Sequence, residues 1–209
     1  MKEKETILQE ISLIKEELEE SPDSPQLLND LGVGYYLIGD YLLSVEALKK
    51  AVRQEPGNPV YHFNLGNSYS EVEEFEEAIS CYLKALELDP SHLGSLTNLA
   101  HCYEEHGDKN RAYDVFSYIV KTAPDDPLSH FNFGNFLLRQ NRHIEAVKSF
   151  EHTLLLDSEF TEAYYNISWV LQQARLYGKA EEYALKGLET DPGNDDLQQL
   201  LANIRSETG

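Results

Sequence analysis

The chain has 209 residues, of which 41% are apolar and 11% aromatic, so we expect a hydrophobic core and not a disordered segment. Its formal net charge of −20 argues against nucleic acid and anionic membranes as partners, because both attract Lys and Arg. The sequence has no signal-peptide pattern, no apolar run near the roughly 18 residues of a membrane span, and no CxxC motif. A cytoplasmic protein with neutral or basic partners is the expectation.

The first predicted element is an amphipathic helix over residues 3–20, within an N-terminal segment 1–24. Ile7, Ile11, Ile14 and Leu18 are spaced four, three and four residues apart, which forms one narrow apolar stripe. We expect this helix to pack on the segment that follows. A single stripe shorter than three heptads is weak evidence for a coiled coil, so a homodimer formed through this helix is the alternative.

The next segment, residues 25–194, carries a pattern that recurs about every 34 residues, a period typical of arrays of helix pairs. The strings HFNLGN at 62–67 and HFNFGN at 130–135 lie two periods apart. Each copy offers two apolar-periodic segments of about 13 residues, the length of ordinary helices. Capping residues before a proline predict where first helices begin, and Asp-Pro pairs predict where second helices end. The starts are Ser24-Pro25, Asn58-Pro59 and Asp126-Pro127, and the ends are Asp89-Pro90 and Asp191-Pro192.

These features resemble the tetratricopeptide repeat. The copy at 59–92 has the family's residues at seven positions and departs from it at His62, where the family prefers Trp. The seven residues are Leu65, Gly66, Tyr69, Ala78, Tyr82, Ala85 and Pro90. The resemblance covers five contiguous copies, 25–58, 59–92, 93–126, 127–160 and 161–194. It implies an all-α fold, a right-handed superhelical solenoid of antiparallel helix pairs whose first helices line a concave face.

The last predicted element is a helix over residues 195–206, within a C-terminal segment 195–209. Leu197, Leu200, Leu201 and Ile204 give it one apolar face. Its remaining residues are polar, which suits a helix that caps the end of a repeat array. The fold class predicted for the whole chain is therefore an all-α solenoid with one flanking helix at each end.

Motifs of catalysis and of cofactor binding are missing from the sequence, which has no phosphate-binding glycine loop, no HExxH and no GxSxG. The densest group of potential metal ligands is HCYEEH at 101–106. On a helix, His101 and Glu105 share one face, while Cys102 and His106 share the neighbouring one. Two ligands per face fall short of the three or four of a zinc site. We therefore expect no enzymatic activity, no cofactor and no metal site.

Candidate binding residues recur at the sixth position of consecutive copies: Asn64, Asn98, Asn132 and Asn166. A carboxamide can bond both the C=O and the N–H of a peptide backbone. Helices packed about 8–10 Å apart would bring one asparagine to about every third residue of an extended peptide. Similar asparagine ladders hold peptides in O-linked N-acetylglucosamine transferases and armadillo-type carriers. The alternative is that these asparagines brace neighbouring helices.

Two further positions of each copy are expected to face the same concave surface. They contribute aromatic rings for apolar side chains, amides and one histidine: Phe63, Phe131, Tyr165, Trp169, Asn67, Asn135 and His101. Glu71, Glu104, Glu105 and Glu162 would make much of the rim acidic, with Arg139 as an exception.

One family subtype can be tested on the sequence, because chaperone-adaptor repeats hold a C-terminal carboxylate with two asparagines and several basic residues. Asn67 and Asn98 match the asparagines of this clamp, but Phe63, Leu128 and Asn132 stand at its basic positions. Without those charges a carboxylate is poorly held. The predicted function is a non-enzymatic module that binds an extended, neutral-to-basic peptide of a protein partner. The alternatives are a self-associating scaffold subunit and a regulatory domain of a larger enzyme.

Overall fold

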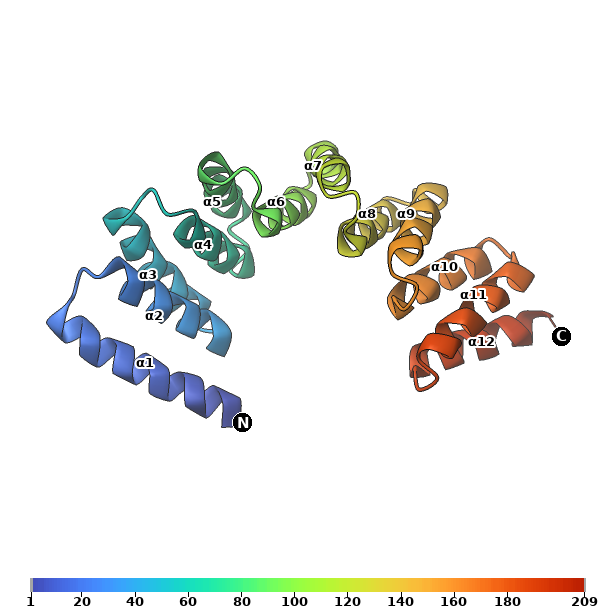
Figure 1. Cartoon of the computed structure of the whole chain (residues 1–209), viewed down its shortest axis with the longest axis horizontal. Helices are drawn as coiled ribbons and strands as arrows, with labels where there is room; N and C mark the ends of the chain where they lie inside the picture. The colour runs from blue at the N-terminus through green and yellow to red at the C-terminus, as the bar shows by residue number, and fades with distance from the viewer. Residues whose placement is uncertain (1, 209) are drawn as a thin grey trace. The chain divides into compact units, whose positions relative to one another are not determined.

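The computed structural model describes residues 2–208, and within that range all regular structure is helical (Figure 1). The helices are α1 Lys2–Glu20, α2 Pro25–Ile38, α3 Tyr41–Gln54, α4 Pro59–Glu71, α5 Phe75–Leu88, α6 Leu93–Glu105, α7 Lys109–Thr122, α8 Pro127–Arg139, α9 His143–Leu156, α10 Thr161–Gln173, α11 Tyr177–Thr190 and α12 Asp195–Thr208. The contacts divide the chain into two compact units, the first ending at Val115 and the second beginning at Phe116. None of the described helices is both long and apolar enough to cross a membrane.

The helix boundaries follow the period of the sequence. Four consecutive first helices, α2, α4, α6 and α8, begin at positions 25, 59, 93 and 127, which are evenly spaced along the chain. Ser24, Asn58 and Asp126 cap three of these helices, each accepting a hydrogen bond from a backbone N–H of the first turn. The predicted capping residues are therefore confirmed. α5 ends at Leu88 and α11 at Thr190, directly before the predicted Asp-Pro stops.

Glycines allow the two helices of a pair to approach closely. A Cβ added at Gly66 in α4 would lie 2.7 Å from Cε1 of Tyr82 in α5, and one at Gly134 in α8 would lie 2.6 Å from Cε1 of Phe150 in α9. Both distances are too short for non-bonded carbon atoms, which sit about 3.5–4.0 Å apart. The ring follows its glycine at the same interval in both pairs, so the repeat places a large side chain against a bare backbone each time.

The first unit begins with α1, whose apolar stripe packs against α2. Ile11 is only 4% exposed, and its side chain lies directly over Gly34 of α2. Leu18 packs on the core formed by Leu28, Ala51 and Tyr61. Ile7, Ile14 and Leu18 are half-buried, so the stripe faces the unit and only Ile11 is fully covered.

The second unit ends with α12, which packs on α10 and α11. Its four apolar residues, Leu197, Leu200, Leu201 and Ile204, are all buried. The guanidinium of Arg205 pairs with Glu181 of α11 at 2.7 Å, at the exposed margin of this contact. α12 starts one full repeat after α10, so it occupies the position of one more first helix.

A side chain at the fourth position of several copies closes the loop that precedes its helix. The ring atom Nε2 of His62 lies 2.9 Å from the carbonyl oxygen of Pro56, and Nε2 of His130 lies 2.9 Å from that of Pro124. Gln198 makes the same bond to Pro192 at 2.8 Å. His62 is 8% exposed, so its ring is buried, and it also donates a hydrogen bond to the Pro56 carbonyl.

Candidate functional site

Within each unit, the predicted asparagines lie on one face of the first helices; we call this face the amide face and define it by the sixth and ninth positions of each copy. Three sixth-position asparagines donate from Nδ2 to an asparagine Oδ1 on the preceding first helix. These bonds are Asn64 to Asn29 (2.9 Å), Asn98 to Asn67 (2.8 Å) and Asn166 to Asn135 (2.9 Å). The amides therefore brace neighbouring first helices within each unit. Contact with a peptide stays a prediction. It would use the amide atoms that take no part in these bonds, such as Oδ1 of Asn98 and of Asn166.

In the first unit, the amide face contains a hollow of about 200 Å³. It is lined by Tyr36, Asn67, Ser70, Glu71, Tyr82, Asn98 and His101. Three of the predicted site residues, Asn67, Asn98 and His101, are thus brought together by α4 and α6. They are joined by a tyrosine from α2 and another from α5, which the sequence analysis did not assign to the site.

A hydrogen-bond network fixes the two asparagines of this hollow. The hydroxyl of Tyr82 donates to Oδ1 of Asn67 at 2.8 Å, and Nδ2 of Asn98 donates to the same oxygen at 2.8 Å. A carbonyl oxygen has two lone pairs, so both are occupied. Burial raises the pKa of Tyr82, which keeps its hydroxyl protonated and able to donate. The network consequently commits Asn67 to present its N–H groups and leaves Oδ1 of Asn98 as an acceptor.

The margin of the hollow is acidic. The hydroxyl of Tyr36 donates to Oε1 of Glu71 at 3.1 Å. Burial and this hydrogen bond raise the pKa of Tyr36 to about 12. Glu71 itself is exposed and lies at the end of α4. A negative charge beside the amides favours a ligand that carries no carboxylate.

The thiol near this hollow has no features of a nucleophile. Sγ of Cys102 lies 3.5 Å from Oγ of Ser70, and burial raises the pKa of Cys102. A raised pKa keeps the thiol neutral at physiological pH, whereas reactive cysteines are thiolates. Among the described residues, no three side chains of His, Cys, Asp or Glu are grouped so that they could hold a metal ion.

Two predicted aromatic residues are held by packing. Phe63 lies against His92 and Tyr82, with ring centroids 4.7 and 6.1 Å apart. Phe131 lies against Phe160 at 4.7 Å and, in the same cluster, against Phe150. Both rings are half-buried, so each contributes part of its surface to the core and part to solvent. Asn132, the neighbour of Phe131 in α8, is half-buried as well.

The other two predicted aromatic residues, Tyr165 and Trp169, line a second hollow of about 430 Å³ in the second unit. α10 and α12 form its walls. The polar residues of α12 were expected only to suit a cap of the array, so their contribution to this hollow was not predicted.

Four lining residues that were not predicted occupy the twelfth and thirteenth positions of their copies. Tyr36, Ser70 and Gln172 stand at the twelfth position, and Gln173 stands at the thirteenth, as does Glu71, which was predicted as part of the rim. These positions follow the ninth by three and four residues, and such residues share one face of a helix. Extending the ninth-position column by one helical turn would have identified them.

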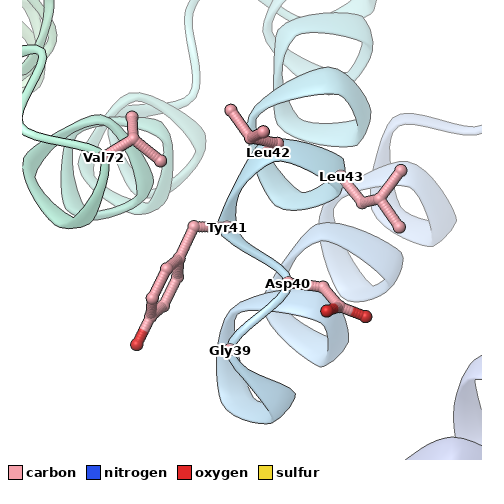
Figure 2. A pocket seen from close by; sticks show the side chains of 6 residues that line it. All are labelled: Gly39, Asp40, Tyr41, Leu42, Leu43 and Val72. Atoms are coloured by element: carbon pink, nitrogen blue, oxygen red, sulfur yellow. The ribbon is translucent and has the colours of Figure 1, made fainter.

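A third hollow, of about 390 Å³, lies in the first unit away from the predicted site residues. Figure 2 shows Val72, which follows α4, pointing towards Tyr41 and Leu42 at the start of α3. Gly39, Asp40 and Leu43 complete its lining, and Leu42 is 72% exposed. The surface there is mainly apolar.

Comparison with known proteins identifies the repeats. Family models described as tetratricopeptide repeat match residues 59–92, 81–114 and 161–194. A curated relative, the Hsp70-Hsp90 organising protein of Plasmodium falciparum, is 26% identical over 103 residues. The matched region is 49% of this chain and 41% of that protein, so the chain corresponds to less than half of the relative's length.

Solved structures show the same fold. The C-terminal part of a TPR repeat-containing protein from Cytophaga hutchinsonii has a TM-score of 0.81 and 17% identity, and the match covers 97% of this chain and 81% of that one. YrrB, whose structure is described as a TPR protein with an unusual peptide-binding site, has a TM-score of 0.65 and 18% identity, covering 92% and 97% of the two chains. At these identities the similarity establishes the fold alone.

Proposed function

We propose that this chain, which belongs to the tetratricopeptide repeat family, is a non-enzymatic protein–protein interaction module that binds an extended, neutral-to-basic peptide along its amide face. The observation that carries the proposal is the network of Tyr82, Asn67 and Asn98. The network fixes two amides at one hollow. Asn67 offers its N–H groups there, and Asn98 offers its carbonyl oxygen. A donor and an acceptor side by side match one peptide unit, which offers one C=O and one N–H.

The pairs on the other first helices support the same role. Asn166 donates to Asn135 and keeps its own Oδ1 outside this bond, as Asn98 does in the first unit. Backbone recognition of this kind is independent of the peptide's side chains. Bracing and binding are therefore compatible, because each brace uses one N–H of the donor and leaves the acceptor oxygen.

Charge favours a neutral or basic peptide. The chain has a formal net charge of −20, and Glu71 lies at the hollow itself. Charge complementarity of this kind speeds encounter and selects partners more than it adds affinity. We expect the affinity of a basic segment to fall as salt concentration rises.

The names of the relatives suggest a chaperone adaptor, but the residues argue for a different ligand. Asn67 and Asn98 match the two asparagines with which such adaptors hold a terminal carboxylate. The adaptors also need basic residues for this purpose. At one position where the clamp has a basic residue, this chain has Phe63, whose ring packs against His92. The other two such positions hold Leu128 and Asn132, which carry no charge. We therefore assign an internal or amidated segment, and not a free C-terminus, as the ligand.

The test uses a partner captured on the full chain from its native lysate and reduced to the bound peptide. We expect Asn98→Ala combined with Asn132→Ala to weaken binding of that peptide in calorimetry by at least about tenfold, since several backbone hydrogen bonds are lost. Asn110→Ala, at an exposed position of α7, is the matched control. Equal affinity of the double variant and the control would refute the ladder mechanism.

The alternative function, a self-associating scaffold that uses α1, is separated by a different measurement. Light scattering of the full chain and of residues 21–209 would show a dimer lost on truncation if α1 mediated association. Because Ile11 is buried against α2, we expect the full chain and residues 21–209 to have the same oligomeric state.

A further inference from the structure

The hollow between α10 and α12 in the second unit has a lining that the peptide ladder does not explain. Its volume is about 430 Å³, within the range of about 300–1,000 Å³ that is usual for ligand sites. α10 contributes aromatic and amide side chains, and most of the residues from α12 are polar. The lining residues that decide its chemistry are Tyr165, Trp169, Gln172, Asp196, Gln199 and Glu207.

Aromatic rings form one part of this lining and are held in place from behind. Tyr165 and Trp169 pack on the buried cluster of Ala180, Leu200 and Ile204. Rings that are anchored on a core cannot turn away from a ligand. Such rings attract cations through the electric quadrupole of the ring, whose face is partially negative, and Trp does so most strongly.

Two carboxylates, those of Asp196 and Glu207, form another part. Nε2 of Gln172 donates to Oε1 of Glu207 at 3.2 Å, and the side chain of Gln172 is 9% exposed. A hydrogen bond with Glu207 also raises the pKa of Tyr177. These contacts orient the Glu207 carboxylate, and an ionised carboxylate still has acceptor sites beyond the two in use. Among the described residues that line the hollow, none is Lys or Arg.

The amides complete the chemistry of the hollow. Gln199 donates from Nε2 to Oδ1 of Asn203 at 3.0 Å along one face of α12. This bond orients the Gln199 amide and leaves its carbonyl oxygen as an acceptor outside the pair. Carboxylate and carboxamide oxygens therefore stand beside anchored aromatic rings.

We propose that this hollow binds the side chain of an arginine in the peptide partner, with the guanidinium between the aromatic rings and the carboxylates. A guanidinium is flat and cationic, carries five N–H donors, stacks on aromatic rings and pairs with carboxylates in two-point geometry. The proposal rests on the proposed function, because it names the side chain that the peptide must carry. It concerns residues of the second unit only.

The chain offers a direct probe of this hollow, because Trp169 is its single tryptophan. The full chain is titrated with N-acetyl-Ala-Arg-Ala-amide while tryptophan fluorescence is followed. The matched ligand replaces arginine by citrulline, which has nearly the same shape and no charge. We expect a saturable fluorescence change with the arginine peptide and at least about tenfold weaker binding of the citrulline peptide, the size of one lost charge-assisted hydrogen bond.

Variants assign the effect to the carboxylates. We expect Asp196→Asn and Glu207→Gln to weaken the arginine peptide several-fold, whereas Asp195→Asn, on the same turn of α12 but outside the hollow, leaves binding unchanged. Glutamine at position 207 retains an oxygen for Gln172, and thermal melts report whether each variant folds. If one variant fails to fold, the comparison of arginine with citrulline on the unaltered chain decides.

Equal binding of both peptides, no saturable change, or equal effects of Asp195→Asn and Asp196→Asn would overturn the inference. Failure here is distinguishable from failure of the proposed function. An unresponsive Trp169 with a captured peptide that still depends on Asn98 refutes only the arginine site. If the captured peptide binds the double variant Asn98→Ala with Asn132→Ala as tightly as the unaltered chain, only the ladder is refuted.

Discussion

Substitution of Gly134 by alanine tests whether the two helices of a pair, α8 and α9, are held in close contact. The added Cβ would lie 2.6 and 2.8 Å from Cε1 and Cδ1 of Phe150, whose side chain is 0% exposed. Overpacking of a buried ring costs about 1–3 kcal/mol, and the new contact is short enough to place the cost in the upper half of that range. Alanine is a better helix former than glycine by about 1 kcal/mol. The net expectation is a loss of about 1–2 kcal/mol in the free energy of unfolding.

The measurement is urea unfolding of the full chain followed by circular dichroism. Gly178→Ala is the matched control in the same unit, because its added Cβ has no atom within 4 Å apart from its chain neighbours and the backbone of its own helix. We expect that control to be neutral or stabilised by up to about 1 kcal/mol. Phe150→Leu should also relieve part of the loss when it is combined with Gly134→Ala. Equal stabilisation by the two glycine substitutions would show that the helices are not held at the spacing described.

Three further outcomes follow from side chains described above. Tyr82→Phe keeps the buried ring and removes the hydroxyl bonded to Asn67, so the free energy of unfolding should fall by about 0.5–1.5 kcal/mol in urea. Ile11→Ala should cost about 2–5 kcal/mol in the same assay, while Leu13→Ala, at a 57% exposed position, should cost little. Burial lowers the pKa of His130, so the unfolded chain binds that proton more readily and stability should fall as pH drops below about 6.5. His130→Gln, which keeps a donor for the Pro124 carbonyl, should remove this part of the pH dependence in melts at pH 7 and below, and an unaltered dependence would contradict it.

Much of the fold could be predicted from the sequence, because similar capping, small and apolar residues recur at the same positions of each copy. The caps at Ser24, Asn58 and Asp126 and the glycine slots are local features, determined by backbone conformation and side-chain size. The positions of the asparagines could be predicted for the same reason. A constant repeat register assigns each residue a face of its helix without reference to the rest of the chain.

Bracing by those asparagines was foreseen as an alternative, but their individual hydrogen-bond partners could not be predicted, because the partners lie in another copy. Nδ2 of Asn98 bonds to Asn67, at the ninth position of the preceding copy, and not to the sixth. The hydroxyl that shares this acceptor belongs to Tyr82, whose slot holds Phe in the next two copies. Likewise, the hollow at Trp169 arises only when α12 docks on α10. Periodicity identifies a face, whereas hydrogen-bond geometry between copies identifies a site.

The loop-closing side chains at the fourth position also bear on how the array unfolds. The carbonyl of Pro56 is satisfied by His62 of the following copy, and that of Pro192 by Gln198 of α12. The loop at the end of one copy therefore depends on the next copy's first helix. When that helix unfolds, the carbonyl of the preceding loop loses its hydrogen-bond donor. Local unfolding within a unit should therefore spread towards the N-terminus more readily than towards the C-terminus. Amide hydrogen exchange would then show each loop exchanging together with the helix that follows it.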